Sequence, residues 1–455
     1  MEPTYPFIGK GVIMFTKSDN WNELSPLERR KARLDHWQNQ PVEFVNPEAE
    51  ANYKKRIDRL RKIYDMEPHD RPIADIYMGA NEYVVRRKGI IGKDMIYNHE
   101  KLREPLLEFH NKFQPDTAAT PLPYPGKVMD MLNYQPYIWG GQKLPDHLTI
   151  QAVEGEYMMG DEYAEFTADP TNFWIKKYLP RVMPTLEPLS MLTELPRISE
   201  NVDIIDLIAP FGSSPFQEML KTLMEAGNGL MKMLEVVGQT AGMIAAAGFP
   251  SMDYGIVKTP FDYLGDTLRG TKNILMDMHR RPDDLLAACE AYVPILINAV
   301  VNACDRSGAP AAMYVLHKGA DTFMSQEQFE KFYWPTWKQV MLALYEEGIT
   351  SYLFVEGSYN NRLEYLAEMP EKSLVCHFDK SEMGPVKEIL SDKFIITGNV
   401  PASLMVAGTV DEVRAYCDDL LELFEDAPAY ILSHGCYFEN TTDEKLRAFM
   451  DAVKK

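Results

Sequence analysis

The chain has 455 residues, of which 45% are hydrophobic and 25% charged, a composition typical of a globular protein with room for one large α/β barrel or two to three smaller domains. The formal charge of −20 argues against nucleic acid or an anionic membrane as partner, because both require a basic surface. No uninterrupted apolar run reaches the roughly 18 residues that span a bilayer, and five irregularly spaced cysteines suggest no disulfide framework. The start of the chain lacks the basic region of a signal peptide, so we expect a cytoplasmic protein.

The first 110 residues are rich in charged and aromatic residues and predict helices. The stretch "SPLERRKARLDHWQN" begins at Ser25, a residue type that caps helix starts. We therefore expect residues 1–110 to form an N-terminal helical extension and residues 111–455 to form the main domain.

Short apolar runs alternate with helical patterns over the rest of the chain. Three helices are predicted to open with capping boxes, formed by Ser325 with Gln328, Thr409 with Glu412, and Thr441 with Glu444. This alternation predicts an α/β protein with a (β/α)8 TIM-type barrel. An open doubly wound sheet is the alternative, but the chain has no G-x-G-x-x-G loop to favour it. The strand-like runs lie at 116–122, 148–154, 203–210, 254–263, 311–317, 351–356, 373–379, 393–399 and 428–434.

The polar residues at the ends of the later runs are the candidate site, because barrel enzymes carry their catalytic groups at the carboxyl ends of strands. Glu356 is the most informative of them. It follows the apolar residues Tyr352 to Val355, where a carboxylate is costly unless something binds it. The candidates are His317, Lys318, Glu356, His377, Asp379, Asn399, His434 and Cys436.

Glu356, His377 and Cys436 could together hold a metal ion. Three protein ligands with one open position make up a catalytic zinc site. Barrel topology brings any strand ends together, however, and each residue has a structural alternative. Cys436 could be a small buried residue, and His377 a hydrogen-bonded core histidine. The spacing by itself leaves both interpretations open.

Six segments of the chain resemble a known family: "VEGEYMMGDEYAEF" (153–166), "TPFDYLGDTLRGTK" (259–272), "YVLHKGADTFMSQEQFEKFYWPTWK" (314–338), "FVEGSYNNRLEYLAEMP" (354–370), "GNVPASLMVAGTVDEV" (398–413) and "YILSHGCYFENTTDEKLRA" (430–448). On these segments, the chain from about residue 70 to the end resembles the uroporphyrinogen decarboxylase superfamily, and within it the corrinoid-dependent methyltransferases of anaerobes.

The resemblance implies a zinc site with an altered ligand set. Thiol-methylating members hold zinc by a His-x-Cys motif at one strand end and by a later Gly-Cys pair. This chain keeps Gly435-Cys436, but it has Phe354 and Glu356 where those members carry histidine and cysteine. His377, at the next strand end, would then supply the nitrogen ligand. A Glu/His pattern is similar to that of the members that demethylate aryl methyl ethers.

The function implied is transfer of a methyl group from a methoxylated aromatic compound to the cob(I)alamin of a separate corrinoid protein, since this chain has no Asp-x-His-x-x-Gly motif for cobalamin. Replacing a thiolate by a carboxylate makes Zn²⁺ a harder Lewis acid, suited to an ether oxygen. We expect Asp379 to orient a ligand or relay a proton, and His317 and Lys318 to stabilise the phenolate. Lys318 could instead pair with Asp321. Tyr359, Asn399 and His434 are the candidate substrate contacts.

Three rival functions remain. A uroporphyrinogen decarboxylase would need an N-terminal Arg-Gln-Ala-Gly-Arg motif, which is missing. A methyltransferase acting on a thiol such as coenzyme M would keep the first His-x-Cys motif. A non-catalytic barrel that only docks a corrinoid protein is the third. A homodimer is expected only by family analogy.

Overall fold

The protein is an α/β structure built on a parallel sheet of seven strands. The computed structural model describes residues 14–76, 83–85, 87, 89–119, 124–252, 254–436, 438 and 440–454. The strand order is β1-β9-β8-β7-β6-β5-β4, with every neighbouring pair parallel. The strands are β1 (Ile73–Asp75), β4 (Tyr254–Val257), β5 (Ala311–Leu316), β6 (Thr350–Val355), β7 (Leu374–Phe378), β8 (Ile395–Val400) and β9 (Tyr430–His434).

The expected alternation of strands and helices holds from residue 254 onward. The six runs predicted there coincide with β4 to β9. No pairing joins β1 to β4 among the described strands, so the parallel sheet is found but the closed eight-stranded barrel is not shown by its pairings.

Two earlier runs were predicted wrongly as strands of the main sheet, and a third lies partly outside the described residues. The run 148–154 contains β3 (Ile150–Ala152), which pairs antiparallel with β2 (Tyr137–Trp139) in a separate hairpin. The run 203–210 forms the helix α10 (Ile204–Ile208) with short helical flanks. Residues 116–119 form no strand, and 120–122 lie outside the described residues. Short apolar runs do not distinguish strand from helix, and tertiary packing decided each case.

Within the range 1–110, the described residues form both helices and one strand. Helices α1 (Pro26–Gln38) and α2 (Pro47–Asp65) precede β1, and β1 lies inside the sheet beside β9. Ser25 opens α1 with the predicted cap, in a capping box with Glu28. The sheet therefore begins within the segment that we expected to be an extension.

Two apolar layers cover the sheet. Leu353 and Val355 of β6 belong to the large core formed with the outer helices, whereas Tyr352 and Phe354 face the opposite way. That second cluster is completed by residues of α1 and α2, among them Leu34. Successive side chains of β6 point to opposite sides of the sheet, and both sides are covered by apolar residues. This strand is therefore buried on both faces.

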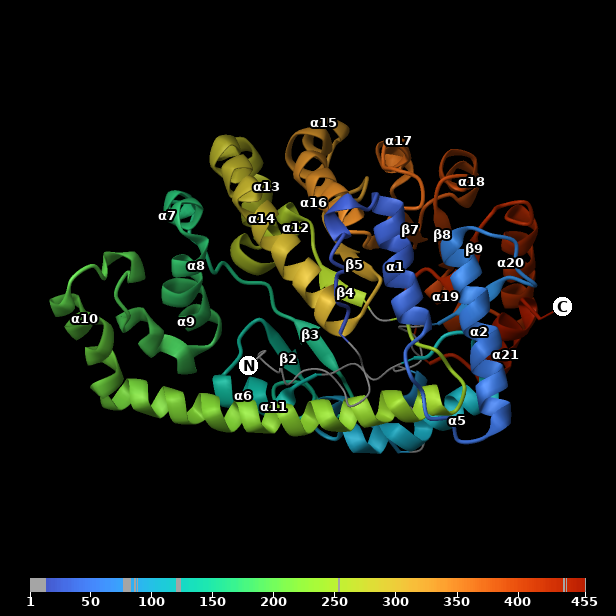
Figure 1. Cartoon of the computed structure of the whole chain (residues 1–455), viewed down its shortest axis with the longest axis horizontal. Coiled ribbons are helices and arrows are strands. Elements are labelled where there is room, and N and C mark those ends of the chain that lie inside the picture. Colours follow the sequence, from blue (N-terminus) through green and yellow to red (C-terminus); the bar gives the residue numbers. More distant parts are fainter. Residues whose placement is uncertain are drawn as a thin grey trace.

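The outer helices follow the strands in sequence, and Figure 1 shows them in a row on the outside of the sheet. The predicted capping boxes at Ser325 and Thr409 are present. The third cap is Thr442 rather than Thr441, whose hydroxyl donates to the Met405 carbonyl instead. The helices are α12 (Pro260–Tyr263), α13 (Thr271–Arg280), α14 (Pro282–Ser307), α15 (Gln326–Gln328), α16 (Trp334–Glu346), α17 (Leu363–Ala367), α18 (Met383–Leu390), α19 (Ala402–Ala407), α20 (Val410–Leu423) and α21 (Asp443–Ala452).

Among the described residues, α14 is the one helix that has the length and composition of a membrane span. It packs against β4, β5 and α16 as part of the layer that covers the sheet. Leu285, Leu296 and Val300 are among its buried residues. An apolar core helix of an α/β protein has the same properties.

Between β1 and β4 the chain forms a helical arm. It contains α4 (Gly92–Tyr97), α5 (Arg103–Phe113), α6 (Gly126–Leu132), α7 (Tyr163–Ala168), α8 (Pro170–Phe173), α9 (Leu179–Val182), α10 and the long helix α11 (Ser214–Ala246). Figure 1 shows α11 along one side of the molecule, with α10 at one end of the molecule and α20 and α21 at the other.

Candidate active site

Asp266 is the centre of the charged cluster at the carboxyl ends of β4 and β5. His317 Nδ1 lies 2.6 Å from its carboxylate, and Lys258 Nζ lies 2.6 Å from the same oxygen. Lys318 Nζ pairs with the other oxygen. Burial opposes ionisation of Asp266, but the hydrogen bond from His317 and the three positive charges lower its pKa well below the usual range. Asp266 is therefore a carboxylate that receives three cationic donors.

Asp262 holds the loop after β5 in place. It is fully buried and accepts the backbone N–H groups of His317 at 3.2 Å and Lys318 at 2.9 Å. The Tyr333 hydroxyl donates to it at 2.6 Å. Burial and the nearby charge of Asp266 raise the pKa of Asp262. Asp262 thus fixes the direction in which His317 and Lys318 leave the strand.

His317 stands between Asp266 and Glu356. Burial alone would lower the pKa of His317, but the hydrogen bond and charge of Asp266 outweigh it and raise the pKa. On the other side, His317 Nε2 lies 3.9 Å from a Glu356 oxygen, and both side chains remain partly exposed. Burial also raises the pKa of Glu356, with Asp379 adding to the effect and His317 opposing it.

Asp379 connects the ends of β6, β7 and β9. Its carboxylate accepts the backbone N–H of Gly357 at 3.3 Å, next to Glu356. A Cβ added at Gly435 would lie 2.9 Å from an Asp379 oxygen, so that residue has no room for a side chain. Glu356 and Cys436, the chain neighbours of these glycines, are therefore brought to the same end of the sheet around Asp379. Cys436 is half-buried.

His377 lies deeper and has both ring nitrogens occupied. Nε2 is 2.7 Å from the His434 carbonyl and 3.2 Å from that of Gly435, and Nδ1 is 2.7 Å from the Tyr352 hydroxyl. Nε2 therefore carries the proton, and Nδ1 accepts from Tyr352. Burial and the neighbouring His434 lower the pKa of His377 to about 3.

The predicted zinc ligands do not fit a zinc ion as they are placed. Zinc requires an imidazole nitrogen with a free lone pair, and His377 has none. Among the described residues, no group of three His, Cys, Asp or Glu side chains is arranged to hold a metal. The unbonded buried nitrogen in this region is His434 Nδ1 instead.

The remaining predicted residues lie in structural positions. Tyr359 is fully buried, which leaves it no surface for a ligand. The Asn399 amide is 5% exposed and donates to the backbone carbonyls of Asp379 at 3.2 Å and Ser381 at 3.0 Å, so it holds a turn. Lys318 pairs with Asp266 and not with Asp321, which pairs with Arg362 instead.

Three residues of the cluster were not predicted to act in the site: Lys258, Asp262 and Asp266. The signal for the two aspartates was present in "TPFDYLGDTLRGTK", where they stand four residues apart just after the end of β4, and Lys258 immediately precedes this segment. Thr259 opens α12 by accepting from the Asp262 N–H. Aspartates four residues apart are also common on the solvated faces of helices. Only the packing of β5 beside β4, which brings His317 and Lys318 to these two carboxylates, shows that they belong to a charged cluster.

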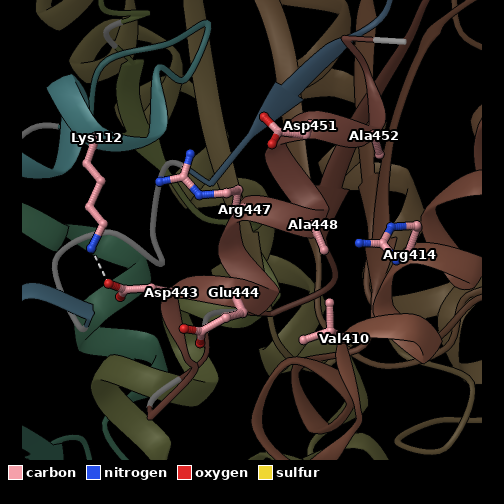
Figure 2. Close-up of a pocket in the computed structure, with 9 residues that line it drawn as sticks. All are labelled: Lys112, Val410, Arg414, Asp443, Glu444, Arg447, Ala448, Asp451 and Ala452. Carbon is pink, nitrogen blue, oxygen red and sulfur yellow. Dashed lines mark hydrogen bonds and ion pairs between the residues drawn. The ribbon is translucent and has the colours of Figure 1, made fainter.

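A separate hollow of about 470 Å³ lies among α5, α20 and α21 (Figure 2). Its lining includes three cations, Lys112, Arg414 and Arg447, and three carboxylates, with Lys112 already paired to Asp443. None of the strand-end residues lines it. Its charges are balanced and its lining shares no residue with the charged cluster, so we do not include it in the candidate site.

Buried charges gathered at the carboxyl ends of parallel strands are typical of a functional site in an α/β protein. The uroporphyrinogen decarboxylase (URO-D) family model matches residues 192–455, more than half of the chain, and the protein belongs to this family. A solved methyltransferase from Methanosarcina mazei has a similar fold, with a TM-score of 0.54 at 16% identity over 87% of this chain and 96% of that one. No curated protein matches the chain.

Proposed function

We propose that this protein is a cytoplasmic methyltransferase that moves the methyl group of a methoxylated aromatic compound to the cob(I)alamin of a separate corrinoid protein. The observation that carries the proposal is the array of Asp266, His317 and Glu356 across the ends of three neighbouring strands. It places two groups whose pKa values are raised at a partly exposed position, where a protonated His317 or Glu356 could assist the removal of a phenolate.

The array is suited to donate a proton to an oxygen atom. Asp266 keeps His317 in one orientation and favours its charged form, in the way that a buried carboxylate orients a catalytic histidine. A separation of 3.9 Å leaves His317 Nε2 and Glu356 unbonded to each other. An ether oxygen beside both could therefore accept from either.

The electron and proton balance of the methyl transfer defines the role of His317 and Glu356. The corrinoid partner would supply a nucleophilic cobalt that accepts the methyl carbon, and the electrons of the broken bond stay on the aryl oxygen. The proton held by His317 or Glu356 neutralises that oxygen as it leaves. Because the predicted zinc ligands do not fit as placed, no step is assigned to zinc.

Alanine at Glu356 or His317 is expected to lower kcat/KM for demethylation by roughly 10²–10⁴-fold, the contribution of a general acid. The assay contains reduced corrinoid protein and a panel of methoxybenzoates, methoxyphenols, methanol and methylamines. Glu371→Gln, an exposed carboxylate change ahead of β7, is the control and should have no effect. Decarboxylation of a porphyrinogen without corrinoid, or no turnover of any methyl donor, would reject the proposal.

The rate should also fall as pH rises. The reactive form of both groups is the protonated one, and both pKa values lie above their ordinary values. Glu356→Gln should remove the contribution of the carboxyl group and leave the pH dependence of His317. A rate that increases through the same pH range would contradict the assigned acid role.

Metal analysis tests the zinc prediction separately. If zinc binds at these strand ends, its imidazole ligand must be the one with a free nitrogen. We therefore predict that zinc in the purified protein is lost on Glu356→Ala, Cys436→Ala and His434→Ala, but retained on His377→Gln. If zinc were lost from the His377→Gln variant but kept in the His434→Ala variant, His377 would be the nitrogen ligand, as expected from the sequence.

A further inference from the structure

Ile256 of β4 is an exposed apolar residue within a buried sheet. It is 62% exposed, although Gly255 and Val257 on either side of it are buried. Gly255 faces α14, because a Cβ added there would lie 3.0 Å from the Cys304 sulfur. Successive side chains of a strand point to opposite sides, so Ile256 lies on the side of the sheet that carries Tyr352, which we call the inner face. Since parallel sheets are normally covered on both faces, this isoleucine has room for a contact that the described residues do not supply.

Ile256 has a second accessible apolar neighbour, and both residues precede charged ones. β4 and β5 are paired, with Ile256 beside Met313. Two residues further along the same face of β5 is Val315, which is half-buried. A step of two residues from each leads to Lys258, just past the end of β4, and to His317, just past the end of β5. Ile256 and Val315 therefore form a small apolar patch beside the charged cluster.

Lys258 is the more accessible lysine of that cluster. Its side chain is 25% exposed, compared with 7% for that of Lys318. Burial opposes the charge of Lys258, but Asp266 outweighs this effect and raises the pKa of the amine, which is therefore protonated at neutral pH. Its ammonium group has three donors, and Asp266 is the one hydrogen-bond acceptor that the described residues offer it. Lys258 is thus a cation with unused donors at the edge of the apolar patch.

We propose that Ile256 and Val315 hold the aromatic ring of the methyl donor, and that Lys258 binds an anionic group on that ring. The inference rests on the proposed function for the kind of molecule that is bound. A ring on this patch would lie between Lys258 on β4 and the proton donors His317 and Glu356 at the ends of β5 and β6, which receive the methoxy oxygen. The donor class is therefore a methoxylated aromatic anion, either a carboxylate or a phenolate.

The size of the patch argues against a protein as its occupant. One side of a standard protein interface covers about 800 Å², whereas this patch consists of two side chains bordered by charges. Ordinary core packing does not explain the patch either, because Val257 and Met313 on the same two strands are at most 4% exposed. A single planar ring is the occupant whose size and polarity fit.

Calorimetric titration of the full chain, without a corrinoid protein, tests the proposal. The probes are methoxybenzoate, methoxyphenol and methoxybenzyl alcohol, which differ in the charge on the ring. Ile256→Ala should weaken the binding of all three about tenfold, because the ring loses apolar contact. Lys258→Met should weaken methoxybenzoate roughly 10–100-fold and leave the neutral alcohol nearly unchanged, whereas Lys258→Arg should keep most of the affinity. If the bound anion is a phenolate, methoxyphenol will bind more tightly as pH approaches its pKa of about 10.

Two matched changes serve as controls, and both should bind the probes as the wild type does. Ile295→Ala alters an isoleucine of α14 that is 40% exposed, and Lys54→Met alters an exposed lysine of α2. Thermal unfolding of the Ile256 and Lys258 variants checks that each is folded.

Three results would overturn the inference: a wild type that binds none of the probes, unchanged binding in Ile256→Ala, or equal losses of benzoate and alcohol in Lys258→Met. Methyl transfer that is unaffected by either change would overturn it and leave the proposed function standing. Binding that depends on both residues, without transfer of any methyl group to a corrinoid protein, would support this site and reject the proposed function.

Discussion

Replacing Asp266 with alanine is expected to lower the free energy of unfolding by about 3–5 kcal/mol, because the buried Lys318 would lose its counter-charge. Lys258 and His317 would lose the same partner. The proposed methyl transfer should be lost together with stability, since His317 would no longer be oriented toward Glu356. Denaturant unfolding measures the first effect and the corrinoid assay the second.

An exposed ion pair and the pH dependence of stability provide two controls for the Asp266→Ala prediction. Glu50→Ala breaks an exposed ion pair with Lys54 and should cost about 0–1 kcal/mol.

The folded pKa of Asp266 is lowered, so its contribution to the free energy of unfolding is present above the unfolded pKa of about 3.9 and disappears as pH falls through the folded pKa. The gap between wild type and Asp266→Ala should therefore persist at neutral pH and close in acid. A gap that is as small as that of Glu50→Ala at pH 7 would show that the cluster is not buried as described.

Gly348→Ala is expected to cost roughly 2–4 kcal/mol, from strain in the backbone and overlap with neighbouring atoms. Gly348 has a φ of 70° at the end of α16, and an added Cβ would overlap the backbone of Arg29 and Arg30 in α1. Arg29 Nη1 donates to the Glu346 carbonyl at 2.7 Å, and Arg33 Nε donates to that of Glu347 at 2.7 Å. Both bonds should weaken as α1 moves away.

Limited proteolysis and thermal unfolding measure this effect. The variant should be cleaved faster between α1 and α2, because α1 no longer rests on the end of α16. Gly212→Ala is the matched control: its φ is not positive, and an added Cβ meets nothing. Equal stability of the two variants would show that α1 does not pack as closely as described.

Much of the sheet was predictable because its strands lie between strongly periodic helices. The runs from 254 onward became β4 to β9, and two capping boxes matched to the residue. Prediction failed for "DIIDLIAP" because three isoleucines and a leucine within five residues fit a buried strand as well as an exposed helix. Nothing local shows that this run lies on the surface of the arm.

The candidate site was predictable as a set of strand ends but not as a set of contacts. His317, Glu356, Asp379 and Cys436 do lie at the same end of the sheet, since parallel strands align their carboxyl ends. Asp266 was missed because two of its three partners, His317 and Lys318, are 51 and 52 residues away in the chain. His377 was interpreted as a ligand because the sequence does not show which acceptors lie around a ring nitrogen.

The sequence by itself determined the α/β alternation, the later strands and the polar residues that follow them, because these depend on period and on capping within a few residues. The tertiary structure alone decided which charges meet: Asp266 with His317, Lys258 and Lys318, and His377 with Tyr352. It also decided that α10 is exposed. Hydrogen bonding and burial depend on distances across the fold, and those distances are set by packing between segments far apart in the chain.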